Sequence, residues 1–385
     1  MGLKKLLKTT LCPIIFLSCA PFEQAVATGL KASENFVFSG VTQLDGKWRD
    51  QEKSNVKDNE VDIRRARLAV SSDPQKKLSY RLQYDFAGSV NVVTDAFVSY
   101  KNNNNELRIG HFKPSFSLEK IISVANITFI DRSVITASTP ARLMGFQGSK
   151  FGENWQAALG IFGEGFGSKN KSDESNYSIS ARATYAPINN CKALLHVGIS
   201  SSYYDRNKDT KVLDANNVRA NPIDEEYYID FELAAKLNSV YFQGEYILNH
   251  VNYDNDAKGS GDSSTTGLKA DYYGYYLQAS WFLTGDEKEY RVRSGDFGAV
   301  KIKNSFGKNG LGAFELAARF SSLDRNDNYD GRNITLGKTY ESTLALNWYP
   351  NENLRVMINY QKVAVDFISY ERKYDIFGIR TQLSF

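Results

Sequence analysis

The segment from Tyr374 to Phe385, with the sequence YDIFGIRTQLSF, decides the fold of this chain. Because side chains two residues apart in a strand share a face, the segment has one mainly apolar face and one polar face. The apolar face contains Phe377, Ile379, Thr381, Leu383 and Phe385, and the polar face contains Gly378, Arg380, Gln382 and Ser384. An apolar outer face and a hydrated inner face are typical of a strand in a transmembrane barrel.

The first 27 residues have the composition of a secretory signal peptide. Three lysines lie before residue 9, the segment 11–20 is apolar, and Ala25-Val26-Ala27 provides an A-x-A cleavage site before Thr28. A lipoprotein signal at Cys19 is the alternative, but phenylalanine replaces the usual leucine three residues before that cysteine. Cleavage after residue 27 removes three lysines and one glutamate, so the formal net charge changes from +3 to +1.

The composition of the remaining chain fits a barrel better than a helical membrane protein. It contains no apolar run of about 18 residues, the length that a transmembrane helix needs. The mean hydropathy is −0.42, yet 13% of the residues are aromatic, which suits a polar lumen and aromatic girdles. Cys191 is the one cysteine after the predicted leader, so no intrachain disulfide can form, and we expect it to be a small buried or lipid-facing apolar residue.

Segments of period-2 alternation, bounded by turn residues, predict about sixteen strands. The clearest has Tyr80, Leu82 and Tyr84 on one face. The predicted strands are 34–44, 61–71, 77–87, 92–101, 105–113, 143–151, 154–163, 176–186, 191–203, 226–237, 239–251, 267–284, 311–323, 338–349, 353–365 and 373–385.

The lengths of the connections alternate in the way expected of a membrane barrel, with short periplasmic turns and long extracellular loops. Two connections break the pattern: 88–91 is a short external turn, and 285–310 is a long internal connection. The long external connections are 45–60, 114–142, 164–175, 204–225, 252–266 and 324–337.

These patterns predict an all-β protein, a transmembrane antiparallel β-barrel of about sixteen strands. Residues 28–385 form its single domain, and 1–27 are the signal peptide. A soluble sandwich rarely runs to sixteen strands, and a plugged barrel of about 22 strands needs a longer chain. Only a closed sheet can satisfy every backbone polar group in lipid.

A series of short motifs resembles the phosphate-selective porin O and P family over nearly all of the mature chain. The resemblance implies a sixteen-stranded porin of the outer membrane of a Gram-negative-type cell, usually trimeric, that carries anions passively. The C-terminal strand ending in Phe385 also resembles the terminal signal that the barrel-assembly machinery recognises. The family motifs are 64–68 (RRARL), 94–97 (TDAF), 109–114 (IGHFKP), 116–120 (FSLEK), 127–133 (ITFIDRS), 142–145 (RLMG), 244–246 (GEY), 283–285 (LTG) with Tyr290, 312–319 (GAFELAAR), 347–349 (NWY) and 380–385 (RTQLSF).

The longest external connection, 114–142, is expected to fold into the lumen as a constriction loop. It contains Lys120, Arg132 and Arg142, with Lys113 at its root, and rings of arginine and lysine in a pore favour anions. The alternative is that these charges pair with one another and pin the loop to the wall. We expect such pairing between Arg132 and its neighbour Asp131.

Strand 61–71 contains the arginines that the family places near its anion site. With Ala66, Leu68 and Val70 toward lipid, the parity places Arg65 and Arg67 in the lumen. Arg64 has the parity of the lipid face, where a guanidinium near mid-membrane costs about 2–4 kcal/mol. We therefore expect Arg64 at the rim, in a subunit contact, or turned inward by a bulge.

Two further pore-lining candidates are Arg108 and Asp95, and Asp95 matches a family position near the constriction. We expect an anion-preferring porin, with phosphate or polyphosphate as its candidate solute. The mixed or acidic external loops depart from the basic ladders of the family's phosphate specialists. The alternatives are a general non-selective porin and a surface adhesin or structural barrel.

The sequence contains no motif of an enzyme. Neither G-x-S-x-G nor HExxH nor a Walker sequence occurs, and His196 has the parity of an ordinary wall residue. We therefore expect no catalysis, no cofactor, no metal site and no nucleic-acid binding. The expected partners are small anions such as phosphate, outer-membrane lipid with lipopolysaccharide, and two further copies in a homotrimer.

Overall fold

The computed structural model describes most of the chain after the predicted leader. The signal peptide predicted over 1–27 and several external connections lie outside the described residues. The described residues are 31–33, 36–51, 57–73, 76–87, 92–137, 139, 141–163, 176–210, 223–253, 269–307, 310–367 and 370–385.

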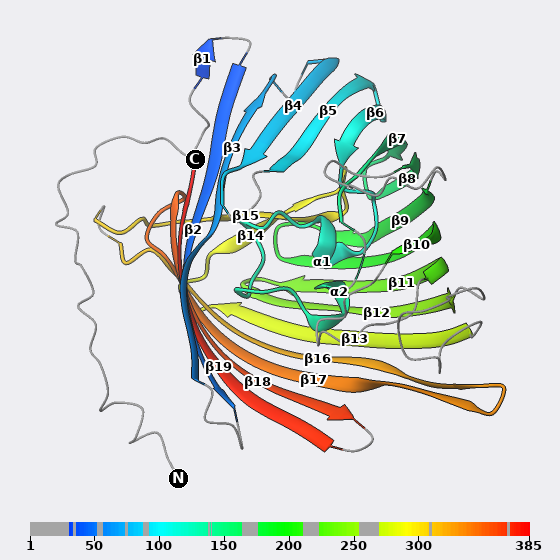
Figure 1. The fold of residues 1–385 in the computed structure, drawn as a ribbon. Coiled ribbons are helices and arrows are strands. Elements are labelled where there is room, and N and C mark those ends of the chain that lie inside the picture. Colours follow the sequence, from blue (N-terminus) through cyan, green and yellow to red (C-terminus); the bar gives the residue numbers. More distant parts are fainter. Residues whose placement is uncertain are drawn as a thin grey trace.

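Sixteen antiparallel strands form a closed barrel, as predicted (Figure 1). A short strand, β1 (Lys31–Ser33), pairs with the first of them. The barrel strands are β2 (Phe36–Gln51), β3 (Lys57–Ser71), β4 (Leu78–Asp85), β5 (Val92–Asn102), β6 (Asn105–Phe112), β7 (Leu143–Phe151), β8 (Trp155–Phe162), β9 (Tyr177–Asn189), β10 (Ala193–Thr210), β11 (Ile223–Leu237), β12 (Val240–Tyr253), β13 (Lys269–Phe282), β16 (Ala313–Tyr329), β17 (Arg332–Tyr349), β18 (Leu354–Phe367) and β19 (Tyr370–Ser384).

The barrel closes between its first and last strands. β19 pairs with β2 in a continuous register in which Ser384 lies opposite Val41. Just beyond, Gly40 and Phe385 exchange two backbone hydrogen bonds of 2.9 and 3.1 Å. The closure leaves no free sheet edge among these strands, which is the condition for a sheet to cross lipid.

Burial along the strands is the reverse of that in a soluble protein. On β11 the large apolar side chains Ile229, Phe231 and Leu233 are exposed on the outer face, while Asp230 and Glu232 between them are buried on the lumen side. The predicted orientation of β19 is also confirmed, since Phe377 and Leu383 are exposed whereas Arg380 and Gln382 are buried. None of the described helices is long and apolar enough to cross a membrane.

The strands differ greatly in length around the barrel. β4 to β8 have 8 to 11 residues and form what we call the low wall. β10 to β13 and β16 to β19 have 14 to 18 residues and form the tall wall. The prediction of a long loop at 324–337 was wrong, because β16 and β17 continue as one hairpin to a turn at Asp330-Gly331.

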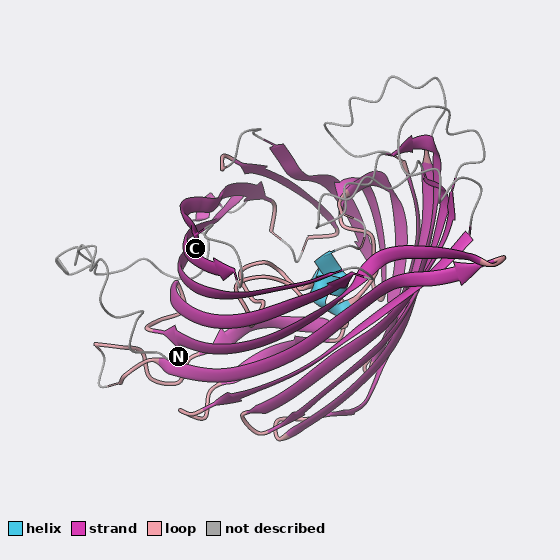
Figure 2. Cartoon of the chain, turned by 60° about the horizontal axis from the view of Figure 1, so that its bottom comes forward, coloured by secondary structure: helices cyan, strands magenta, loops and turns pink. Residues whose placement is uncertain are grey.

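Two segments occupy the lumen. One is the connection between β6 and β7, which contains the short helices α1 (Leu118–Ile121) and α2 (Val134–Ala137) inside the ring of strands (Figure 2). The other is the hairpin formed by β14 (Glu287–Arg291) and β15 (Asp296–Lys301) within the connection between β13 and β16. We call them the constriction loop and the periplasmic hairpin.

The lumen is not polar throughout, which corrects the expectation from composition. The constriction loop and the periplasmic hairpin share an apolar cluster with inward side chains of the tall wall. Burial of apolar surface stabilises both segments inside the barrel. Hydrogen bonds exposed to water would stabilise them only weakly, because water competes for the same groups. The cluster includes Leu118, Ile122, Ile127, Leu194, Tyr241, Phe282, Phe297 and Tyr349, with Tyr290, Val300 and Ile302 packed against it.

Candidate functional site: the constriction

The constriction loop begins with an anchor on the tall wall. The backbone N–H of Ser117 donates to Ser200 Oγ (3.2 Å), and those of Leu118 and Glu119 donate to the Glu245 carboxylate (2.5 and 3.0 Å). N–H groups at the start of a helix have no carbonyl partner within the helix. Glu245 therefore satisfies two buried donors and fixes where the loop enters the lumen.

The far side of the loop is held by cations of the tall wall. Arg355 donates to the carbonyl groups of Ile127 and Thr128 (2.7 and 3.1 Å), and Arg380 donates to that of Ile130 (2.7 Å). Among the described residues, no hydrogen bond joins the loop to β3 or β4, although its anchors reach from β10 and β12 across β18 and β19 to β2, the strand next to β3. Further donors to loop carbonyls are Gln43, Arg319, Asn347 and Gln382.

Three cations predicted for the site are bound within the loop by backbone carbonyls. Lys113 Nζ donates to Lys120 O (2.7 Å), Lys120 Nζ donates to Thr139 O (2.6 Å), and Arg132 donates to Ile122 O (2.8 Å). A carbonyl is a dipole without net charge. These contacts therefore fix the positions of the three cations without cancelling their charge.

The two loop lysines lie in an environment that disfavours a proton. Burial and the nearby Arg132 lower the pKa of Lys120 from 10.5 to about 8. Burial, Arg132 and Arg142 also hold the pKa of Lys113 well below 10.5. Burial is the larger cause for both lysines, and repulsion by the neighbouring guanidinium groups adds to it.

The predicted pairing of Asp131 with Arg132 was wrong. Asp131 forms an ion pair with Lys47 of β2 (2.7 Å), whereas Arg132 donates to backbone carbonyls of the loop, including that of Glu119 (3.1 Å). The two neighbouring side chains face different elements, so adjacency in sequence did not make them partners. Asp131 does attach the loop to the barrel wall, as expected of such charges, but through Lys47.

A β-bulge in β3 explains Arg64. Gln43 of β2 lies opposite Arg65, and the next residue, Leu44, lies opposite Ile63, so Arg64 is the extra residue. Ile63 is half exposed on the outer face, and Arg64 interacts electrostatically with Arg65 and with Asp131 of the constriction loop. Of the three alternatives left by the sequence, the structure therefore has the bulge, with Arg64 and Arg65 both on the lumen side.

The lumen side of β3 and its neighbours is rich in arginine, and we call it the cationic face. Arg65 donates to the amide oxygen of Gln43 (2.8 Å), which is uncharged. Within the described part of the chain, neither Arg64 nor Arg65 forms an ion pair with a carboxylate. The cationic face consists of Arg64, Arg65 and Arg67 of β3, Arg81 of β4, and Arg142 just before β7.

Two carboxylates lie within the cationic face. Asp85 forms an ion pair with Arg67 (2.7 Å). Asp95 of β5 lies between Arg142 (2.6 Å) and Arg81 (3.5 Å). Each carboxylate offsets one positive charge, so the face retains a positive excess.

Arg108 lies elsewhere in the lumen. It pairs with Glu106 (3.0 Å) on β6, close to the short turn that precedes this strand, and lies over the ring of Phe97. Glu106 also pairs with Arg293 of the periplasmic hairpin (2.8 Å). The structure thus does not bring Arg108 together with the arginines of β3.

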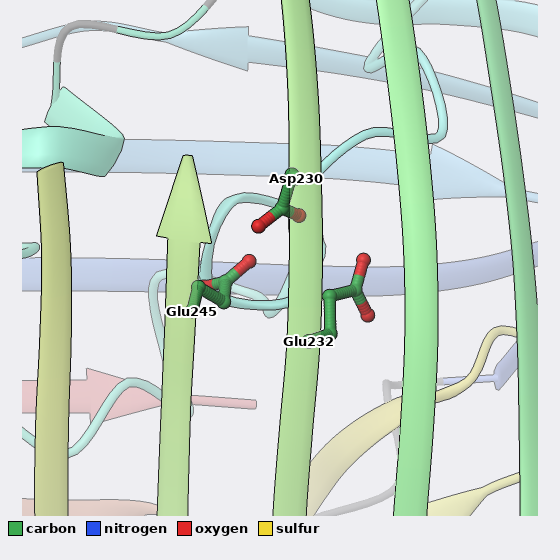
Figure 3. Close-up of side chains that lie close together, drawn as sticks. All are labelled: Asp230, Glu232 and Glu245. Carbon is green, nitrogen blue, oxygen red and sulfur yellow. The ribbon is translucent and has the colours of Figure 1, made fainter. Parts of the chain in front are cut away.

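Across the barrel, β11 and β12 present an acidic face made of Asp230, Glu232 and Glu245 (Figure 3). Asp230 and Glu245 incline toward each other, and Glu232 is turned toward the other side. Among the described residues, this is the one group of three acidic side chains close enough to share a metal ion. Protein donors already engage all three: Ser200 donates to Asp230, Arg182 to Glu232, and backbone N–H groups to Glu245.

Glu232 belongs to a buried network that anchors the periplasmic hairpin. Arg182 donates to both of its carboxylate oxygens (2.7 Å each) and to the carbonyl of Gly295 at the hairpin tip (2.8 Å). His196 lies between Glu232 (3.2 Å) and the Tyr290 hydroxyl (2.7 Å). Neither Arg182 nor this role of His196 could be inferred from spacing along the sequence, since their partners are far away in the chain.

The sequence profile of the family described as "Phosphate-selective porin O and P" matches residues 39–385, which includes every barrel strand apart from the first residues of β2. The chain belongs to this family. Porin O of Pseudomonas aeruginosa is 23% identical over 355 residues, covering 80% of this chain and 77% of that protein.

Solved porins share the fold. OmpT of Vibrio cholerae, folded in vitro, has a TM-score of 0.59 at 12% identity and is covered to 99%, with 92% of this chain. The anion-selective porin from Comamonas acidovorans has a TM-score of 0.56 at 12% identity and is covered to 99%, with 91% of this chain. The chain is therefore an outer-membrane porin of the phosphate-selective porin O and P family, a channel and not an enzyme.

Proposed function

We propose that this porin is a passive channel that favours small anions over cations. The observation that carries the proposal is the pair Arg64 and Arg65, which face the lumen without a carboxylate partner among the described residues. Lys113, Lys120 and Arg132 add positive charges whose hydrogen-bond acceptors among the described residues are uncharged backbone carbonyl groups. Positive side chains along a constriction attract anions and repel cations.

We place the passage along β3 and β4, because no hydrogen bond among the described residues joins the constriction loop to these two strands. A solute there meets the cationic face on one side and the loop cations on the other. Asp95 competes with the solute for Arg81 and Arg142, which weakens binding and speeds release. A channel needs such a limit, since a solute that binds too tightly blocks it.

Phosphate is the anion that the arginine geometry suits best. The planar guanidinium group can donate two parallel hydrogen bonds to phosphate oxygens. Membership of the family and the similarity to Porin O support this choice. The small net charge after leader removal favours the alternative, a general porin without strong preference.

We also propose assembly as a homotrimer through the low wall. Strands of 8 to 11 residues are about as long as a bilayer crossing needs and carry no extension above it, so neighbouring subunits can meet there without a clash between extended hairpins. One solved relative, OmpT of Vibrio cholerae, is described in a trimer form. Phe385, which pairs with Gly40 at the closing seam, is the proposed contact for the assembly machinery.

The test is the reversal potential of the purified porin in planar bilayers under a potassium chloride gradient. We expect an anion preference that falls by roughly fivefold in Arg65→Ala, because one unit charge at about 4 Å is worth about 1 kcal/mol even in water. Phosphate should block the chloride current of the wild type, and the double variant Arg64→Ala/Arg65→Ala should be less sensitive.

Arg108→Ala is the matched control, because it removes a lumen arginine that is paired with Glu106 and lies away from the cationic face. Its selectivity should be unchanged. A wild type that conducts both ions equally would show a general porin. A wild type without stepwise conductance would show a structural or adhesive barrel, and either result would end the proposal.

A further inference from the structure

The outer surface of the tall wall contains an apolar groove, although the outside of a barrel is normally convex. The groove has a volume of about 1000 Å³ and crosses the outward faces of strands from β10 to β18. Three small residues, Gly244, Ala279 and Ala318, form its floor. The surrounding residues are large and apolar and include Phe242 and Phe320.

The strand register explains why the wall is hollow here. Ala279 and Ala318 lie directly opposite each other on β13 and β16, and Leu344 of β17 lies opposite Ala318. On β12, a Cβ at Gly244 would lie 2.7 Å from the side chain of Leu277, which therefore crosses over the glycine. Small residues on three neighbouring strands, with large apolar side chains around them, thus create the depression.

One end of the groove carries a lysine. Lys362 lines the groove and lies two residues beyond Tyr360 on the same face of β18. β18 starts directly after the short turn at 350–353, so Lys362 lies toward the end of the barrel that carries the long loops. Its side chain is exposed and forms no ion pair within the described residues, and its cross-strand neighbour Asp375 accepts a hydrogen bond from Tyr360 (2.8 Å).

An apolar groove that ends at an unpaired ammonium group matches one kind of ligand, a lipid with a phosphate on its headgroup. We propose that the groove binds an acyl chain of a phosphorylated glycolipid of the outer leaflet, with its phosphate at Lys362. The loop-side position of Lys362 selects the outer leaflet, because an inner-leaflet lipid would place its headgroup at the opposite end of the groove. This site is separate from the lumen and does not depend on the proposed anion preference.

The test is native mass spectrometry of the folded porin in detergent, titrated with hexa-acylated lipid A, with dephosphorylated lipid A and with phosphatidylglycerol. Lipid A should bind at least as a one-to-one complex and more tightly than either other lipid. Lys362→Gln should weaken lipid A binding about fivefold, the value of one lysine near an anionic headgroup, and leave the dephosphorylated form unchanged. Ala318→Phe should abolish binding by filling the floor.

Ala183→Phe is the control, because Ala183 is exposed on the outer face of β9, outside the groove. It should bind lipid A like the wild type. Equal binding of all three lipids, or unchanged lipid A binding in both groove variants, would overturn the proposal. A loss of oligomers in Ala318→Phe with no change in lipid binding would assign the groove to a second copy of the chain instead.

Discussion

The cationic face and the acidic face lie on opposite sides of the same lumen but use their charges differently. In the ring of strands, β11 is eight strands from β3 in either direction. On the acidic face, Glu232 is engaged by Arg182, and Glu245 by backbone N–H groups of the constriction loop. On the cationic face, Arg64 and Arg65 have no such partner among the described residues.

The difference shows which charges hold the architecture and which are available to a solute. A buried carboxylate that accepts two or three hydrogen bonds fixes the segment that donates them. An arginine that contacts only an amide or a carbonyl keeps its net charge and a coordination position for an anion. The same lumen therefore has a structural half and a proposed selective half.

The largest expected effect comes from breaking the acidic face. Arg182→Ala leaves the Glu232 carboxylate buried with less than its full set of donors, and both side chains are nearly inaccessible. Removing one partner of a buried ion pair costs about 3–5 kcal/mol. We expect a lower midpoint of unfolding, measured by the temperature at which the folded band disappears on gels.

The double variant Arg182→Ala/Glu232→Gln controls for the orphaned charge. It should recover a large part of the lost stability, because the buried carboxylate is gone. If the double variant is no more stable than Arg182→Ala, the loss comes from the hairpin contacts of Arg182 at Gly295 and not from the unpaired charge.

A smaller effect should come from sharpening the cationic face. Asp95→Asn removes the carboxylate between Arg81 and Arg142 and should raise the anion preference by up to about fivefold. Reversal potentials measure the change, and stronger block by phosphate should accompany it. Asp324→Asn, which removes a carboxylate paired with Lys338 on the extended hairpin, should leave the selectivity as it is.

The fold was predictable because lipid imposes a regular pattern on every strand. All sixteen barrel strands lie where the alternation predicts them. Their outer ends were underestimated, as for β10, which extends to Thr210, because a hairpin above the membrane needs no outward apolar residue and loses the period-2 signal. The periplasmic hairpin escaped assignment for a similar reason, since its strands have only five and six residues.

The candidate site was only partly predictable. Parity placed Arg65 and Arg67 on the lumen side, but the orientation of Arg64 depends on how β2 pairs with β3, which the sequence of β3 alone does not contain. The partners of Asp131 and Arg132 are set by the path of the constriction loop. Long-range partners of this kind follow from tertiary structure, not from spacing along the chain.

A rise in pH should slightly reduce the positive charge of the constriction loop. With a pKa of about 8, Lys120 is a cation below pH 8 and neutral above it, so positive charge is lost as the pH rises from 7 to 9. Lys113 also has a lowered pKa and adds to the effect. We expect the anion preference, measured by reversal potentials, to fall by about twofold over this range.

Lys120→Arg tests the origin of the pH dependence, because a guanidinium group stays protonated at pH 9. It should reduce the decline without abolishing it, since Lys113 and its electrostatic neighbours Arg132, Arg142 and Asp95 are unchanged. A decline of the same size in this variant would exclude Lys120 as its source.

The smallest effect is expected at an exposed ion pair of the periplasmic hairpin. Lys301 and Glu289 are 3.6 Å apart, with side chains 71% and 46% exposed. Water and salt screen such a pair, so Lys301→Gln should cost less than about 0.5 kcal/mol by the same gel assay. Arg182 anchors the same hairpin. Comparing the two variants therefore shows whether the stability loss depends on the burial of the ion pair or only on its position at the hairpin. If Lys301→Gln lowered the stability as much as Arg182→Ala, any charge change on the hairpin would destabilise the barrel. The buried ion pair of the acidic face would then not be the cause of the large effect of Arg182→Ala.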